Sequence, residues 1–507
     1  MTTRTPYLAS GPSLAASSPP LPGARFEAVA RRAQQEVRPG LVLALLYACG
    51  LAVARAIDVT EDGPVMLLFG AAYSATVTVS ALLRPRWYLP LVVAYLPFSK
   101  VYPLPVAGIA GANLTNLLLV LGPVAWLSSR FQGRPDLRAK LPDLLAVLFV
   151  AVASLSLLPA YAAGPGLGEL VQTYRAWLAP VLFFFMARGL ARDREDIRAV
   201  LQVMAWTTLL VAADTWRAGL ERSSRGSIDA ARVPGLMVQA NSMGAFLAYY
   251  GVPLLAFAMN ARPRRRALAY FASFAFAVRA TLYTFSRGAY LALAAGAGTV
   301  LAFTSPVLLA TAGGGGAVTL LAFPSLIPES VRERLADTTA ERSVPSAFEG
   351  ENATVSLDRS SAHRLVLWRG AAQMIADHPL TGVGLGRFQE LIGYYTEYPL
   401  RRSDPHDAHN AFILLAAETG LPTLALLLLL FLAWSLIALK LRFRRRHPVD
   451  RGLALAFLGS LVAVVVSSLL GSRFSDEALV GWFWILAALV VVAGRLRDPF
   501  RPARRAA

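Results

Sequence analysis

Long apolar runs separated by short polar connections recur along most of the chain. Most runs approach about 20 residues, the length at which an α-helix crosses about 30 Å of hydrocarbon. The pattern therefore predicts an all-α polytopic membrane protein with about twelve to fourteen transmembrane helices. We place the segments near 41–57, 64–83, 86–104, 107–128, 142–160, 173–189, 196–215, 237–259, 267–285, 288–304, 307–325, 409–439, 452–471 and 478–496.

The same pattern divides the chain into five parts. Residues 1–40 begin with a Ser/Pro/Ala-rich stretch without an apolar core, so we expect a flexible cytoplasmic tail and no cleavable signal peptide. A transmembrane bundle follows over 41–327, and then a long periplasmic loop over 328–408. C-terminal transmembrane helices span 409–496, and 497–507 form a second cytoplasmic tail.

Composition supports the membrane assignment, because the chain is 56% hydrophobic and only 16% charged. The net charge of +18 does not indicate a nucleic-acid partner, since the basic residues form short clusters between apolar runs. The single cysteine, Cys49, excludes an intrachain disulfide.

The basic clusters also predict orientation, because short cytoplasmic loops retain Lys and Arg. One set of alternate connections is much richer in these residues than the other, which places both termini in the cytoplasm. The richer connections contain Arg25 to Arg38, Arg130 to Lys140, Arg188 to Arg198, Arg262 to Arg266, Lys440 to Arg446 and Arg495 to Arg505.

The long loop then faces the opposite side. Its stretch from Ser360 to Ala376 has the apolar spacing of a helix. Ordered loops of this length usually carry function, and this one ends directly before a membrane segment with polar residues at its mouth.

Two of the five histidines of the chain lie at that mouth, His406 and His409. If a helix begins near Ala408, then His409 and Asn410 occupy its first turn, where free backbone amides also favour an anion. A proton-transfer residue beside an anion site is one interpretation, and a histidine that merely caps the helix is the other. A zinc site from both histidines and a nearby aspartate is a weaker possibility, because spacing places no third strong ligand.

Four arginines from distant regions fall on the same external side: Arg175, Arg232, Arg287 and Arg364. A guanidinium near the membrane surface suits phosphate, because its planar fork donates two parallel hydrogen bonds. Each arginine alone has a simpler explanation, such as the side chain of Arg287 reaching back to the interface. Together they indicate a site for a polyanionic, membrane-embedded substrate.

The combination of motifs resembles the O-antigen ligase and O-antigen polymerase family of bacterial envelope glycosyltransferases. Ser286-Arg287-Gly288-Ala289, the stretch from Pro379 to Gly386, and His409-Asn410 followed by Glu418-Thr419-Gly420 carry the resemblance. Asn241 after Arg232 is similar to a weaker motif of the family. The glycines of the second motif do not form a nucleotide-binding loop, since no Lys-Ser/Thr ending follows them.

The resemblance implies a metal-independent, inverting transferase of the GT-C type without cofactors, in the bacterial inner membrane with its active site facing the periplasm. Its donor would be an undecaprenyl-diphosphate-linked glycan and its acceptor a glycan or a lipid. Flippase and chain-length regulator proteins, along with membrane lipids, are further candidate partners, and nucleic acid is not one. By motif position the catalytic residue is His409, the diphosphate-binding residues are Arg287, Arg364, Arg232 and Arg175, and the supporting residues are His406, Asn410, Asn241 and Glu418.

Three alternatives stay open. We favour a polymerase of surface polysaccharide over a ligase to lipid A-core, because no feature specific to lipid A-core recognition is visible. A transporter of lipid-linked sugars would also need arginines in a polar cavity, and Arg279, within a predicted segment, fits that alternative best. A non-catalytic scaffold of the envelope is the third.

Overall fold

The computed structural model describes residues 22–105, 113–132, 140–164, 166–222, 228–322, 359–396 and 407–498. Within these ranges the regular structure is helical, apart from one isolated bridge between Pro105 and Asn113, which confirms the predicted all-α class. The helices are α1 (Pro22–Ala56), α2 (Pro64–Leu83), α3 (Pro85–Tyr95), η1 (Leu96–Phe98), α4 (Leu114–Phe131), α5 (Leu141–Ser154), α6 (Leu157–Ala162), α7 (Leu167–Leu190), α8 (Arg194–Arg222), α9 (Ile228–Ala231), η2 (Gly235–Met237), α10 (Ala240–Asn260), α11 (Arg264–Leu282), α12 (Arg287–Thr304), α13 (Pro306–Ala322), α15 (Arg359–Asp377), α16 (Phe388–Tyr395), α17 (Ala411–Thr419), α18 (Leu421–Arg444), α19 (Pro448–Ser468) and α20 (Glu477–Arg495).

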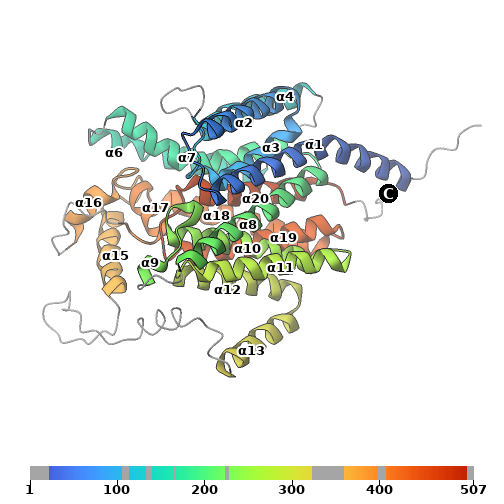
Figure 1. Ribbon diagram of the computed structural model, residues 1–507. Coiled ribbons are helices and arrows are strands. Elements are labelled where there is room, and N and C mark those ends of the chain that lie inside the picture. Colours follow the sequence, from blue (N-terminus) through green and yellow to red (C-terminus); the bar gives the residue numbers. More distant parts are fainter. Residues whose placement is uncertain are drawn as a thin grey trace, which may run out of the picture.

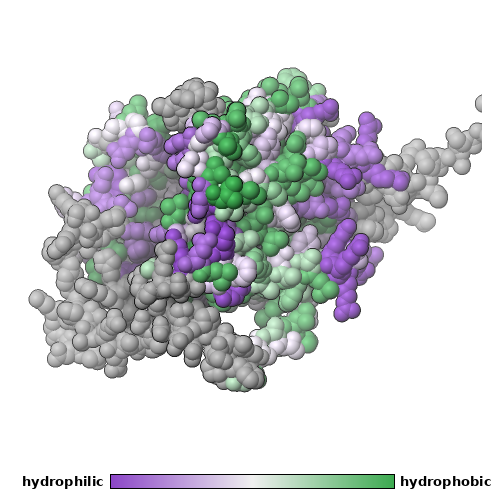
Figure 2. All heavy atoms as spheres, in the orientation of Figure 1, coloured by the Kyte–Doolittle hydropathy of each residue, from purple (hydrophilic) through white to green (hydrophobic). Residues whose placement is uncertain are grey.

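Ten helical segments in the described ranges are long and apolar enough to cross a membrane. Figure 2 shows the corresponding hydrophobic surface lying between groups of hydrophilic residues. The protein is therefore a multi-pass membrane protein. These segments are Arg31–Ala56, Pro64–Leu83, Leu114–Phe131, Leu141–Ala162, Leu167–Leu190, Arg194–Arg222, Ala240–Asn260, Leu421–Arg444, Pro448–Ser468 and Glu477–Arg495.

The other four predicted segments are also helical, but each is too short or too polar to qualify as a span by itself. α3 has only 11 residues and continues into η1, which contains Pro97. α13 has 17 residues, α11 opens with three arginines, and α12 begins at Arg287. Charged and proline-bearing ends thus shorten these apolar runs.

The N-terminal tail differs from the prediction. α1 begins at Pro22 and continues without interruption to Ala56, so residues 22–40 are helical and not part of a flexible tail. Residues 1–21 lie outside the described ranges.

The centre of the bundle is formed by α10, α19 and α20, which pack against one another and against α7 and α12. Buried polar side chains in this core bond backbone atoms of neighbouring helices, as a low-dielectric interior requires. The Tyr250 hydroxyl donates to the Leu479 carbonyl at 2.6 Å and accepts from the Phe483 amide at 3.0 Å. Ser460 Oγ donates to the Tyr249 carbonyl at 2.7 Å.

One end of the bundle, which we call the basic end, gathers the predicted basic connections. Arg194 donates to both carboxylate oxygens of Asp450, at 2.9 and 2.8 Å, and to the Arg497 carbonyl. Arg86 pairs there with Glu36 and Asp193. The start of α1 lies at this end in Figure 1. The connections that are rich in Lys and Arg along the sequence therefore lie together at one end of the bundle.

The opposite end, called the site end, carries α15, α16 and α17 (Figure 1). These helices share a small core of their own, built around Leu367, Phe388 and Ile392. α15 confirms the helix predicted over 360–376. The predicted segment 409–439 is instead two helices broken at Gly420, and its first part, α17, packs with the loop helices.

Candidate active site

Residues 407–410 join the long loop to α17, and we call them the His409 corner. The Asn410 side chain caps α17 by accepting hydrogen bonds from the amides of Phe412 and Ile413, at 3.0 and 3.1 Å. Trp368 Nε1 on α15 donates to the Ala408 carbonyl at 2.7 Å and so anchors the other side of the corner. The imidazole of His409 is 43% exposed, a level that lets it reach a substrate.

The glycine-rich segment from Pro379 to Gly386 lies against the far end of α17. The Val383 and Gly384 amides donate to the carbonyls of Ala417 and Glu418, at 2.9 and 3.2 Å. These amides are therefore engaged by the protein and do not form a phosphate loop. The Leu421 amide donates to the Pro379 carbonyl at 2.8 Å, which fastens the segment across the break between α17 and α18.

Arg232 and Asn241, the two residues of the weaker motif, are in contact. Arg232 Nη2 donates to Asn241 Oδ1 at 2.6 Å, and its Nε donates to the Thr284 carbonyl at 3.3 Å. The Val233 amide donates to the Tyr283 carbonyl at 3.1 Å. Arg232 therefore ties the start of α10 to the corner that precedes α12.

Arg287 is the first residue of α12, directly after the N-cap Ser286. Its half-buried side chain lies at the site end, because its corner is bonded to Arg232 and to the start of α10. The helix dipole favours an anion at the start of a helix, so an anion bound beside Arg287 would be attracted by both the guanidinium group and the start of α12.

Three site-end helices follow the same strained turn. Val238, Phe285 and His409 have φ angles of 63°, 49° and 48°, and each stands two residues before the first residue of α10, α12 and α17 respectively. The left-handed region is uncommon for residues other than glycine, and such strain clusters at functional sites. The spacing of apolar residues along the sequence does not predict these positive φ angles.

The remaining predicted residues lie on other elements. Arg364 lies on α15 one turn before Trp368, on the helix face that meets the His409 corner. Arg175 on α7 pairs with Glu477 at 3.5 Å, at the start of α20. His406 lies outside the described ranges, so the zinc interpretation that depends on it is not addressed.

Residues 272–428 match the family model of O-antigen ligase, a stretch that includes Arg287, the glycine-rich segment, His409 and Glu418. The chain carries an O-antigen ligase domain. This confirms the predicted family and its broad class, a membrane glycosyltransferase of the O-antigen ligase and polymerase type. Arg175, Arg232 and Asn241 lie before the matched stretch. No curated protein matches the chain significantly.

A cavity of about 350 Å³ opens beside the His409 corner of this O-antigen ligase domain. Asp407 and Glu418 line it from the loop side, Thr173 from α7, and Arg473 from the connection between α19 and α20. Arg473 escaped the sequence analysis, because nothing in its local pattern distinguishes it from a topology-determining arginine. Its Nε is buried and has no hydrogen-bond partner in the described part of the chain.

Glu418 lines this cavity, and the pKa of its carboxyl group is raised above the ordinary value. The pKa of the carboxyl group is raised to about 7, mainly by burial and to a smaller extent by the charge of Asp407, although hydrogen bonds from the backbone amides of Gly386 and Phe388 oppose the shift. The Phe388 amide donates to Glu418 Oε1 at 3.2 Å. Glu418 therefore links α16 and the glycine-rich segment to α17.

The connection between α19 and α20 contacts both the start of α12, near Arg287, and α17, near His409. Leu470 packs on Gly288, the neighbour of Arg287, with its Cδ1 3.3 Å from the position that a Cβ would occupy. Four residues later, the ring of Phe474 contacts that of Phe412 on α17, with centroids 5.7 Å apart. Arg287 and His409 thus flank one short connection.

Proposed function

We propose that this O-antigen ligase domain transfers a glycan from an undecaprenyl-diphosphate carrier to an acceptor hydroxyl. The observation that carries the proposal is the arrangement at the site end, where the accessible His409 stands beside a cavity that Asp407 and Arg473 line. Arg287 and Arg364 lie at the same end of the bundle. A lipid diphosphate leaving group needs cationic donors near the membrane surface, and the acceptor hydroxyl needs a proton acceptor.

In the proposed mechanism, His409 accepts the proton of the acceptor hydroxyl as its oxygen attacks the anomeric carbon. The bond between that carbon and the diphosphate oxygen breaks on the opposite face, so the configuration inverts. Arg287 and Arg364 stabilise the negative charge that builds on the departing lipid diphosphate. In this scheme the guanidinium groups supply the charge stabilisation, and no step requires a metal ion.

Arg232 and Arg175 have different proposed roles. Arg232 is engaged by Asn241 and the Thr284 carbonyl, so it positions the corner before Arg287. Arg175 is paired with Glu477 beside the cavity and would meet the substrate only if that pair opens.

The location proposed for this chemistry is the periplasmic face of the bacterial inner membrane. The basic end gathers the Lys- and Arg-rich connections, which by the positive-inside rule belong in the cytoplasm. The site end then faces the periplasm, with both termini cytoplasmic.

The transporter alternative is weakened by the position of Arg279. This residue lies in the last turn of α11, near the site end, where its Nη2 donates to the Tyr283 hydroxyl at 2.9 Å. Its guanidinium carbon also lies 4.3 Å from the centre of the Tyr283 ring. A transport path needs ionisable groups deep in the bilayer, and Arg279 is not such a group.

Polymerisation of surface-polysaccharide repeat units is the preferred reaction, with ligation to lipid A-core as the second candidate. The test is a reconstituted assay with purified protein, a lipid-linked glycan and a metal chelator, with products separated by gel and identified by mass spectrometry. A ladder of longer lipid-linked glycans supports the polymerase, and transfer to added lipid A-core supports the ligase. No transfer to any acceptor would overturn the proposal and favour a transporter.

A further inference from the structure

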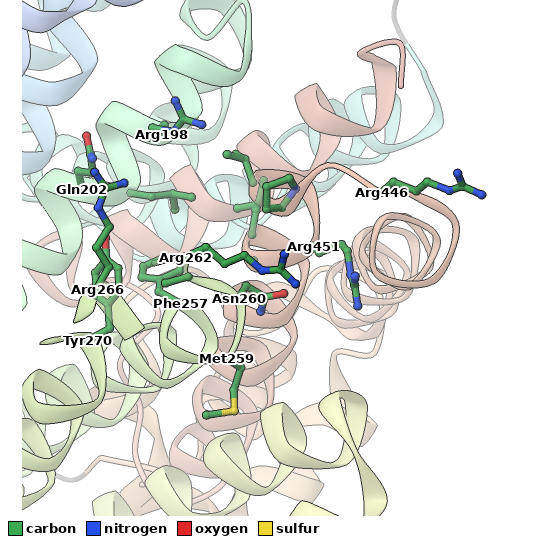
Figure 3. A pocket seen from close by; sticks show the side chains of 16 residues that line it. Arg198, Gln202, Phe257, Met259, Asn260, Arg262, Arg266, Tyr270, Arg446 and Arg451 are labelled. Carbon is green, nitrogen blue, oxygen red and sulfur yellow. The ribbon is translucent and has the colours of Figure 1, made fainter. Parts of the chain in front are cut away.

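A second cavity, of about 680 Å³, lies at the basic end of the bundle, far along the helices from His409. It opens between α8, α10, α11 and α19 (Figure 3). Five arginines line it, and none of its described lining residues is acidic. They are Arg198, Arg262, Arg266, Arg446 and Arg451.

The acidic groups nearest in the sequence are already engaged. Arg198 is paired with Glu195 at 2.7 Å, on its own helix. Asp450, the neighbour of Arg451, is fully buried and held by Arg194. Arg451 Nε is buried without a hydrogen-bond partner among the described residues. The cavity therefore keeps a surplus of positive charge that a bound anion would offset.

The arginines also differ in direction. In Figure 3 Arg262 extends toward Arg451, whereas Arg266 extends toward Gln202 and Arg446 extends away from the other arginines. Arg262 and Arg266 are exposed to the cavity mouth. Arg262 and Arg451 thus provide guanidinium donors of the kind that suit a phosphate group.

Part of the cavity wall is apolar. Leu201, Phe257 and Leu453 line it, and they belong to α8, α10 and α19, which are all candidate membrane spans. A cavity that combines cations at the helix ends with an apolar wall fits an amphiphile with an anionic head better than a small soluble anion. A third cavity, of about 620 Å³, shares Arg446 and Arg451 with this one and extends the basic surface.

We propose that this basic cavity binds the phosphate headgroup of an anionic phospholipid, with the acyl chains along the apolar wall. The site is separate from the transferase site and does not depend on the proposed reaction. Arg262 and Arg451 would donate to the phosphate, Arg266 would add positive charge at the cavity mouth, and Phe257 would contact the glycerol and upper acyl region.

The experiment measures the binding of spin-labelled phosphatidylglycerol and phosphatidylcholine to the purified protein in nanodiscs. The full-length protein should prefer phosphatidylglycerol, and the double variant Arg262→Gln/Arg266→Gln should reduce that preference about tenfold. Both residues are exposed, so the change should not unfold the protein. Arg451→Gln provides a second variant within the cavity.

The matched control is Arg264→Gln/Arg265→Gln, which removes the same charge from the same stretch at two exposed positions that do not line the cavity. This control should keep the preference. An equal loss in both double variants, or no preference in the unmodified protein, would overturn the proposal.

Inorganic phosphate distinguishes a lipid from a soluble ligand. At low millimolar concentration it should not displace phosphatidylglycerol, because it lacks the apolar contacts. Displacement at that concentration would mean that the cavity takes a soluble phosphate compound and would also overturn the proposal.

Discussion

The carboxylate of Asp407 lies 3.5 Å from Nδ1 of His409, and the two residues are separated by a single alanine whose carbonyl is held by Trp368. A carboxylate at this nitrogen favours the tautomer that carries its proton on Nδ1. The other ring nitrogen, Nε2, is then the basic one. The pair therefore has the arrangement that the proposed base requires.

Replacing Asp407 tests this orientation. Asp407→Asn keeps the size of the side chain but removes the charge that stabilises the imidazolium, so kcat should fall about tenfold or more with little change in KM. Steady-state kinetics in the reconstituted assay measure both constants. A rise in KM at unchanged kcat would instead assign Asp407 to substrate binding.

Two glycines, Gly382 in the glycine-rich segment and Gly420 at the break between α17 and α18, are predicted not to tolerate a larger side chain. A Cβ at Gly382 would lie 2.2 Å from the Glu418 carbonyl carbon, and one at Gly420 would lie 2.2 Å from the Leu380 oxygen. Both glycines also have left-handed φ angles, 67° and 83°, which alone cost about 1–2 kcal/mol for alanine. Gly382→Ala and Gly420→Ala should each lower the thermal unfolding midpoint clearly.

Gly393 in α16 is the control for this pair, because a Cβ there meets no atom within 4 Å. Gly393→Ala should be neutral or stabilising by up to about 1 kcal/mol. If all three variants unfolded at the same temperature, the close packing of the glycine-rich segment on α17 would be contradicted.

Glu418 should make stability depend on pH. Its pKa in the folded protein, about 7, lies above the ordinary 4.5, so between these values the folded state binds more protons than the unfolded state. Stability must then fall as pH rises from about 4.5 to 7 and level off above, by about 1.4 kcal/mol for each unit of pKa difference. Glu418→Gln, which mimics the protonated form, should remove this dependence.

Thermal unfolding of the two proteins at pH 5 and pH 7.5 measures the effect. The variant should gain stability over the unmodified protein as pH rises. Glu390→Gln, at an exposed carboxylate on α16, is the control that should show no such gain. A constant difference between Glu418→Gln and the unmodified protein at both pH values would show that Glu418 titrates normally.

Chemical labelling tests the proposed orientation. In a Cys49→Ser background, the exposed positions Gly393 and Arg265 can each be changed to cysteine. With the outer membrane permeabilised, a membrane-impermeant maleimide should label Gly393→Cys in intact cells. It should label Arg265→Cys only after the inner membrane is opened. The reverse pattern would place the site end in the cytoplasm.

Sequence reasoning predicted the helices well, because the bilayer imposes a long apolar period that a single sequence displays. It failed where one residue changes the path of the backbone. Gly420 adopts φ 83° and ψ 163°, a conformation almost restricted to glycine, and so splits an apolar run that reads as one continuous helix. The helix over 22–40 was missed because its sequence is too polar to suggest one.

The candidate site was predictable only in part. Arg232 and Asn241 were noted as one motif, and the structure adds that their side chains are in contact. Asp407, Arg473 and the strained corners at Val238 and Phe285 depend on long-range packing, which spacing along the chain does not encode. Their recognition needed the folded arrangement of α7, α17 and the α19–α20 connection.

The most direct test of the account compares His409→Ala with the unmodified protein for glycan transfer in the reconstituted assay. His378→Ala, at an exposed histidine after α15, is the matched control and should transfer at the unmodified rate. The account predicts that His409→Ala folds with an unchanged unfolding midpoint but loses about 10²- to 10⁴-fold in turnover. Unmodified turnover in folded His409→Ala would contradict the assignment of His409 as the catalytic base.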